Sequence, residues 1–231
     1  MPSVLSFTPE LWQSIWLTLK LASLTTIALL VLGIPLAHWL NVSRWRGALV
    51  VETLVTLPIV LPPTVIGFYL LILFAPQNPL GKLWIQMTGH TLAFSFSGLV
   101  VGSIIYSLPF AVQPFQAALK AVPLTLVEVA RISGANVLQV FWYVTLPIAR
   151  RGIGAGIALS FAHTIGEFGV VLMLGGSIPG VTRVASIALY DEVQKLNYPA
   201  AHSTALVLLG ISFVLIFAIA ILQRRTPSDA Q

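Results

Sequence analysis

The sequence contains no cysteine and very little charge. Without cysteine there is no disulfide framework, no thiolate metal site and no cysteine nucleophile. Only 8% of the 231 residues are charged, whereas 57% are hydrophobic and the mean hydropathy is +0.94. Soluble domains carry about 25% charged residues, and disordered chains combine low hydrophobicity with high charge. The composition therefore excludes a disordered chain, argues against a soluble domain and predicts a membrane protein.

The common catalytic motifs are also absent. The sequence has no GxxxxGK[ST] phosphate-binding loop, no HExxH zinc motif, no GxSxG nucleophile elbow and no TVGYG ion filter. Its four histidines fall on four different segments, so nothing in the pattern supports a zinc site. These absences argue against an enzyme and against ATP hydrolysis by this chain. Transport or a structural role remains.

Long apolar runs predict an all-α integral membrane fold with five transmembrane helices. A bilayer core about 30 Å thick needs roughly 20 apolar residues per helix. The predicted spans, all in one domain covering 1–231, are residues 12–40, 49–75, 91–119, 152–174 and 200–222. Residues 76–90 are predicted as a polar connection with helix breakers at each side, and residues 175–198 as a loop-like segment. Residues 120–151 form a longer segment of more polar character.

Basic residues are distributed unevenly between the two sides of such a bundle. One side would carry Lys82, Arg183 and Lys195. The other would carry Arg44, Arg46, Lys120, Arg131, Arg150, Arg151, Arg224 and Arg225. Because cytoplasmic loops carry an excess of Lys and Arg, we expect segment 120–151 and the C-terminus to be cytoplasmic and the N-terminus to lie outside. Bases placed as topology signals also argue against nucleic-acid binding, despite a net charge of +5.

Segment 120–151 has the pattern of two short helices joined at a glycine. Pro123 suits the first turn of one helix, Gly134 its end, and Asn136 the cap of the next. Pro147 is expected to break the chain before the fourth span. The pattern leaves two interpretations open. The segment is either a surface hairpin folded on its own bundle or a docking element for a cytoplasmic partner.

Within this segment, Glu128 and Arg131 are spaced to pair across one helical turn. The segment resembles the EAA loop of binding-protein-dependent ABC importer permeases, and the matching positions are Glu128, Ala130, Gly134, Leu146 and Pro147. Val129 and Val144 stand where that family has alanine and isoleucine. In that family the loop forms a coupling helix that sits in a groove of the ATP-binding subunit. The resemblance implies a type I ABC importer permease fold.

Two further stretches narrow the resemblance. LPIVLPPTVIGFYLL, in the second span, resembles the proline-rich segment of molybdate permeases, and residues 166–183 resemble a segment shared by molybdate and sulfate-type permeases. The implied function is uptake of molybdate, and of tungstate, which has nearly the same size and charge. Three alternatives stay open: a sulfate or thiosulfate permease subunit, an autonomous secondary transporter or channel, and a membrane assembly factor that shows no solute flux.

The same resemblance implies an assembly in the lipid of a bacterial inner membrane. A homodimer of this chain would form the pathway, with two ABC ATPase subunits on the cytoplasmic side. A periplasmic or lipid-anchored molybdate-binding protein would dock outside, near residues 76–90 and 175–199. Arg183 either receives the anion there or contacts that partner. The chain itself would bind no cofactor, since ATP and Mg would belong to the ATPase subunits.

Prolines and glycines suggest irregular or close-packed positions within the spans. Pro58, Pro62, Pro63 and Gly67 interrupt the second span and are expected to kink it. Irregular backbone at membrane depth needs cover from protein or water, so this segment either faces the pathway or is a fixed structural kink. Small residues let helices approach closely. The fourth span opens with Gly152, Gly154 and Gly156, which suggests either a tightly packed core or a seam between two copies of the chain.

Polar residues inside the spans are candidates for the pathway or for packing. Ser103 and Ser107 lie one turn apart and either line a pathway or bond helices together. Lys20 and Glu167 are charges within spans, and such charges are usually paired or functional. At equal depth they could pair or share a water; alternatively Lys20 extends outward and Glu167 is protonated. His163 is expected to be a packed polar residue.

Overall fold

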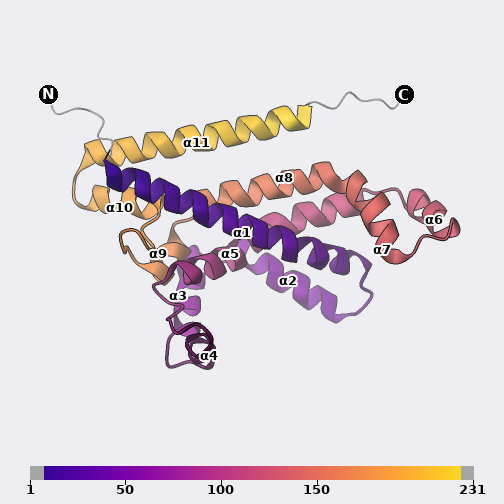
Figure 1. Ribbon diagram of the computed structural model, residues 1–231, viewed down its shortest axis with the longest axis horizontal. Coiled ribbons are helices and arrows are strands. Elements are labelled where there is room, and N and C mark those ends of the chain that lie inside the picture. The colour runs from indigo at the N-terminus through magenta and orange to yellow at the C-terminus, as the bar shows by residue number, and fades with distance from the viewer. Residues whose placement is uncertain (1–7, 225–231) are drawn as a thin grey trace.

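The computed structural model describes residues 8–224, which form helices joined by short connections. The long helices are α1 (Pro9–Val42), α5 (Phe96–Lys120), α8 (Leu146–Ile165) and α11 (Tyr198–Arg224). They run alongside one another along the longest axis of the molecule (Figure 1). The predicted all-α fold is therefore confirmed for the described residues. Arg225 and the terminal segments used in the orientation argument lie outside that range.

Three single helices and two bent helix pairs account for the apolar runs. The helices α1 and α5 and residues 198–218 of α11 are each long and apolar enough to cross a membrane. The first bent pair is α2 (Gly47–Val60) with α3 (Pro63–Leu73), at 118°. The second pair runs from Val137–Ile165 into α9 (Gly169–Gly175), at 57°. Residues 8–224 thus contain three helices that are long and apolar enough to span a membrane, or up to five such segments if each bent pair is one span.

The expected kink in the second run lies between Pro62 and Pro63. Residues that precede a proline avoid the helical region, and Pro62 is accordingly extended, with ψ of 136°. Pro58 lies inside α2 and Gly67 lies inside α3, and neither ends its helix. Gly67 instead allows α3 to approach α9, because a Cβ at this position would lie 2.7 Å from Cβ of Met173. The outer half of this run is therefore covered by protein.

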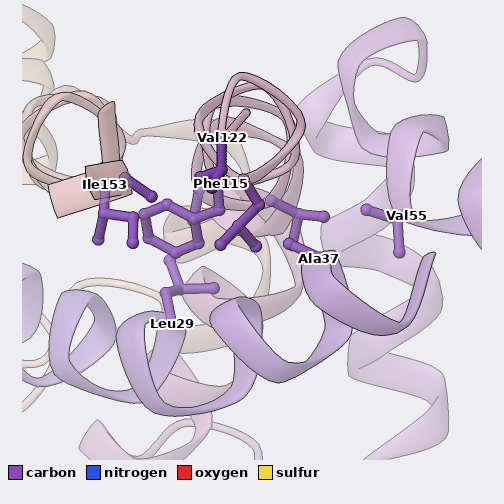
Figure 2. Close-up of a cluster of buried hydrophobic side chains, with 10 residues drawn as sticks. Leu29, Ala37, Val55, Phe115, Val122 and Ile153 are labelled. Atoms are coloured by element: carbon purple, nitrogen blue, oxygen red, sulfur yellow. The ribbon is translucent and has the colours of Figure 1, made fainter. Parts of the chain in front are cut away.

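An apolar cluster fills the space between α1, α5 and α8. Phe115 is completely buried at its centre. Figure 2 labels Phe115 with five other members of the cluster: Leu29, Ala37, Val55, Val122 and Ile153. Two glycines make room for the aromatic ring, because a Cβ on Gly33 or on Gly156 would lie 3.1 Å or 2.7 Å from its carbon atoms. Phe115 thereby holds three helices together.

The glycines at the start of the fourth predicted span differ in their surroundings. A Cβ on Gly152 would lie 2.5 Å from Cβ of Ala118, so α5 and α8 are in backbone contact there. A Cβ on Gly154 would meet nothing within 4 Å. The prediction of a packed core is therefore confirmed at Gly152 and Gly156, and at Gly154 the alternative of a seam between two copies of the chain stays a prediction.

Two connections between the predicted spans contain helices, so the prediction of a loop-like segment over residues 175–198 is wrong. Residues 76–90 include α4 (Pro79–Thr88), and residues 175–199 include α10 (Ala185–Gln194). In α4 the helix breakers act as caps, with Pro79 in the first turn and Gly89 in the left-handed conformation after the end. The N–H of Ala185 at the start of α10 donates to Oγ1 of Thr18 at 2.8 Å, so α1 supplies the cap from outside.

The two short helices predicted within residues 120–151 are present. They are α6 (Leu124–Ile132) and α7 (Val137–Val140). Gly134 follows α6 with φ of +90°, the conformation that glycine adopts at little cost. Asn136 and Gln139 form a capping box, each side chain accepting from the other's backbone N–H at 2.9 Å. Both local predictions are confirmed.

The expected break at Pro147 is wrong. The chain stays helical from Val137 to Ile165, passing through a π-helical segment, η1 (Phe141–Thr145). The N–H of Leu146 donates to the carbonyl of Phe141, five residues back. This wider turn leaves room for the proline ring, which would clash with the carbonyl of an ordinary helix. Pro147 therefore lies in the first turn of α8 and does not end a helix.

Candidate functional site

A layer of polar side chains crosses the bundle between two apolar clusters. One of these clusters is the group around Phe115. The other includes Leu21 of α1, Leu99 of α5 and Val171 of α9, together with Leu17, Val184 and Ile187. The α8–α9 segment runs opposite to α1 and α5 (Figure 1). Thr25 and Ser103 lie one helical turn after Leu21 and Leu99, toward the Phe115 cluster, and Glu167 lies in the non-helical elbow four residues before Val171.

Glu167 lies at the elbow between α8 and α9, and its side chain is buried. The residue is 4% exposed, and neither carboxylate oxygen has a hydrogen-bond partner. Ser103 is fully buried and lies close to this carboxyl, and its own Oγ has no partner that meets the geometric criteria for a hydrogen bond. The Glu167 backbone is anchored more firmly, since its carbonyl accepts from Oγ of Ser186 at 2.6 Å. The predicted residues Ser103 and Glu167 therefore share one buried place.

Ser107 joins α5 to α8 through two side-chain hydrogen bonds. Its Oγ lies 2.9 Å from Nδ1 of His163 and 3.0 Å from Oγ1 of Thr164, which donates to the carbonyl of Ser160. Each hydroxyl has a single hydrogen. All three bonds therefore form together only when Ser107 donates to Thr164 and the Nδ1–H of His163 donates to Ser107. Of the two interpretations of Ser107, the structure favours helix bonding.

His163 is packed between aromatic rings, as expected for a structural polar residue. Its ring stacks on Phe110 with centroids 3.7 Å apart, and the Tyr106 centroid lies at 4.9 Å. Thr25 and Thr164 belong to the layer but carry no sequence pattern that marks them as site residues. The only trace on α1 is the spacing of Ser14, Thr18 and Thr25, which places small hydroxyl residues on one buried face.

The hypothesised pair between Lys20 and Glu167 is not formed. Nζ of Lys20 lies over the ring of Phe96, 4.7 Å from its centroid, and it makes no ion pair within residues 8–224. Phe96 begins α5, so the lysine extends toward the end of the bundle and away from the polar layer. This agrees with the alternative in which a long basic side chain reaches outward.

Pro63 lies beside the elbow, which connects the broken second run to the polar layer. A Cβ on Gly169, two residues after Glu167, would lie 2.8 Å from Cβ of Pro63. Pro62 precedes it as the extended residue at the break. The structure thus brings Pro63, Ser103, Ser107, His163 and Glu167 into one region and leaves Lys20 outside it.

Arg183 is engaged by acidic residues of its own chain. It donates to Asp191 at 3.1 Å and to Glu192 at 3.0 Å, both on α10. Lys195 lies 3.0 Å from the same Glu192 carboxylate. Burial raises the pKa of Glu192, but hydrogen bonds from Lys195, Asn197 and Arg183 outweigh it, so the pKa lies below its ordinary value. Arg183 therefore fixes the loop before α10 to that helix. This contact was not predicted from the sequence, because no helix was expected within residues 175–199.

The predicted coupling residues lie at one end of the molecule. They are Glu128, Ala130 and Arg131 on α6, Gly134 in the following turn, and Leu146 and Pro147 at the start of α8. No residue of α6 is buried, and the ion pair expected between Glu128 and Arg131 is not formed. Apolar side chains are exposed here, including Leu124 and Ile132, the latter at 86%. The turn with Arg44 and Arg46 lies at the same end (Figure 1).

Comparisons with known proteins place this geometry in context. Residues 29–227 match the family described as "Binding-protein-dependent transport system inner membrane component". The "Molybdenum transport system permease protein ModB" of Azotobacter vinelandii is 47% identical over 206 residues, 89% of this chain and 91% of that protein. The "Sulfate transport system permease protein CysT" of Escherichia coli (strain K12) is 33% identical over 217 residues, 94% of this chain and 78% of that protein.

Solved structures share the fold at low sequence identity. A bacterial ABC transporter involved in the import of the acidic polysaccharide alginate has a TM-score of 0.77 at 20% identity, covering 96% of this chain and 82% of that chain. The inward-facing MetNI methionine ABC transporter has a TM-score of 0.73 at 17% identity, covering 96% and 100%. A further alginate transporter, solved with its pentasaccharide-bound periplasmic protein, has a TM-score of 0.74 at 19% identity, covering 94% and 80%.

Proposed function

The chain belongs to the family of binding-protein-dependent transport system inner membrane components, and we propose that it is the permease subunit of an ABC importer for molybdate. The proposal of molybdate as the substrate rests on the 47% identity to a molybdenum transport permease across nearly the whole of both chains. Tungstate, which has nearly the same size and charge, is the second expected substrate. The lower identity to the sulfate permease keeps sulfate as the alternative.

The coupling role of segment 120–151 is supported by its exposure. A membrane protein that leaves Leu124, Val129 and Ile132 uncovered at one end has apolar area available for a partner. Two cytoplasmic ATPase subunits, one on each copy of this chain, would cover α6 around Glu128 and Gly134. ATP and Mg would bind to those subunits, and this chain would hold neither.

The remaining assembly follows from the same proposal. Two copies of the chain form the pathway, and the end that carries α6 and α7 faces the cytoplasm, because the excess of Lys and Arg lies there. An oxyanion-binding protein docks at the opposite end, near α4 and α10. Arg183 contributes to that surface through its loop, and its guanidinium stays bound to Asp191 and Glu192.

Reconstituted vesicles test the substrate and the mechanism together. The purified chain and its ATPase subunit are inserted with ATP on the α6 side, and the cognate binding protein is loaded with molybdate, tungstate or sulfate. ATP-dependent uptake of molybdate and tungstate, without sulfate, is the expected result. Uptake of sulfate alone would show that the protein is a sulfate-type permease and refute the proposal of molybdate as its substrate. Uptake without ATP or without binding protein would refute the ABC mechanism.

A coupling variant separates this proposal from an autonomous transporter. Gly134→Val places a branched side chain at a φ of +90°, where it is strained, while a Cβ at this position meets no neighbour that could disturb the bundle. We expect the variant to assemble with the ATPase subunits, and we expect the resulting complex to hydrolyse ATP but to lose most of its uptake. Gly154→Val, also free of neighbours but far from α6, is the matched control. An autonomous transporter would keep its uptake in both variants.

A further inference from the structure

The elbow between α8 and α9 holds an uncompensated acidic group. Glu167 is 4% exposed, and within residues 8–224 neither of its carboxylate oxygens meets a hydrogen-bond donor or a cationic side chain. Lys20 is directed to Phe96, and Arg183 is bound to Asp191 and Glu192. A buried carboxylate without a counter-charge is very costly. The carboxyl is therefore neutralised either by a proton or by a bound cation.

Two hydroxyl oxygens on α1 and α5, the helices packed against α8, also lack partners. Ser103 and Thr25 are completely buried, and their hydroxyl oxygens make no hydrogen bond. Ser103 lies close to the carboxyl. Leu21 and Leu99 belong to the same apolar cluster, and Thr25 and Ser103 follow them by one helical turn each, so we infer that the two hydroxyls lie at the same level of the bundle. The polar layer thus supplies carboxylate and hydroxyl oxygens, the ligand type that hard cations prefer.

The broken helix adds further negative potential at this place. α8 ends at Ile165, and the chain bends by 57° before α9 begins at Gly169. The C-terminal end of a helix carries about half a negative charge on its carbonyls. Half-helix ends at interruptions inside membrane proteins coordinate small cations in several transporters. The elbow therefore combines a carboxylate, two hydroxyls and a helix C-terminus.

The charge balance selects a monovalent ion. One carboxylate balances one positive charge, and the described residues contain no group of three or more His, Cys, Asp or Glu placed to hold a metal ion. Divalent cations usually draw on more than one carboxylate when protein supplies the ligands. We propose that the elbow binds a monovalent cation, with sodium as the probe, between Glu167, Ser103 and Thr25. The bound ion holds α1 and α5 against the elbow.

Thermal unfolding of the purified full chain in detergent tests the site. Stability is compared in sodium chloride and in choline chloride at equal ionic strength. Because a ligand at tenfold excess over its Kd shifts the unfolding equilibrium about tenfold, we expect sodium to raise the Tm by about 3 °C in a chain of this size. Equal Tm values in the two salts would overturn the proposal, since a carboxyl that is neutralised by a proton needs no sodium.

Two variants locate the effect. Glu167→Gln keeps the shape of the side chain and removes its charge, so its Tm is expected to be the same in both salts. Glu52→Gln, which changes an exposed carboxylate on α2, is the matched control and keeps the full sodium effect. If sodium stabilises Glu167→Gln as much as the wild type, the ion binds elsewhere and the proposal is wrong.

A milder variant keeps the proposal testable if Glu167→Gln does not fold. Thr25→Val preserves the side-chain volume and the carboxylate but removes one oxygen ligand. We expect the sodium concentration that gives half of the Tm increase to rise about tenfold, the equivalent of one lost polar contact. Unchanged sodium dependence in Thr25→Val would remove Thr25 from the site and overturn the proposed ligand set. None of these measurements depends on the transported substrate.

Discussion

Two alanine substitutions on one turn of α8 measure how tightly α5 and α8 are packed. Both Gly152→Ala and Gly154→Ala gain about 1 kcal/mol of helix propensity. A Cβ at Gly152 would lie 2.5 Å from Cβ and 3.3 Å from Cα of Ala118, whereas a Cβ at Gly154 would meet nothing within 4 Å. Since carbon atoms pack at about 3.5 Å or more, the two helices must separate by roughly 1 Å at Gly152.

The magnitude follows from what can yield at the contact. Ala118 offers only its backbone and Cβ, so no flexible side chain can move aside. Such overpacking costs about 1–3 kcal/mol. Because the propensity gain is common to both variants, it cancels in their difference. Gly154→Ala is therefore expected to be the more stable variant by about 1–3 kcal/mol, and to exceed the wild type by about 1 kcal/mol.

Thermal unfolding of the purified variants in one detergent measures this difference. For a chain of this size, about 2–4 °C in Tm corresponds to 1 kcal/mol. Transport is measured in parallel, because a wider α5–α8 spacing also disturbs the bond between Ser107 and Thr164. If Gly152→Ala unfolds at the same temperature as Gly154→Ala, or above it, the close approach of the two backbones is refuted.

Three shorter predictions concern other parts of the chain. Ile132→Asp should lower ATP-dependent uptake about tenfold or more at unchanged Tm, because a charge on the exposed face of α6 must lose its water on docking; Ile132→Leu is the control, and full uptake by the Asp variant would contradict docking. Ser107→Ala leaves His163 without its acceptor and should cost about 1–3 kcal/mol in unfolding experiments; an unchanged Tm would contradict the network. The lowered pKa of Glu192 contributes stability above its ordinary value of 4.5, and this stability is lost as the pH falls through the lowered value. The wild type should therefore lose more stability than Glu192→Gln between about pH 5 and pH 3, and parallel pH profiles would contradict this.

Features that depend on local sequence were predictable. Apolar runs identify the helical segments, and Gly134 and Asn136 mark a helix end and a cap because their effect requires only neighbouring residues. The kink at Pro62 and Pro63 follows from the same local chemistry. The prediction of a break at Pro147 was wrong because a π-helical turn just before it accommodates the proline ring without ending the helix.

Features that depend on how helices align were not predictable. The polar layer requires the register of α1 and α5 with the elbow, and no single segment contains that information. In the sequence, nothing distinguishes Thr25 from other polar residues of an apolar helix. Its level in the bundle becomes known only because Leu21 and Leu99 belong to one buried cluster. Lys20 and Glu167 failed to pair because depth alone does not fix the direction of a long side chain. In α10 the helical spacing that joins Asp191 and Glu192 to Arg183 depends on a cap supplied by Thr18.

The unbroken helix from Val137 to Ile165 has a mechanical consequence. Its longest part, α8, has 20 residues and is about 30 Å long at 1.5 Å per residue. One end carries the surface around α6 and α7, and the other ends two residues before Glu167. A rod of about this length, pivoting where Phe115 meets Gly156 near its middle, turns a tilt of about 5° into a displacement of about 1.3 Å at each end. Such a lever would transmit a push on α6 to the polar layer without unfolding any turn between them.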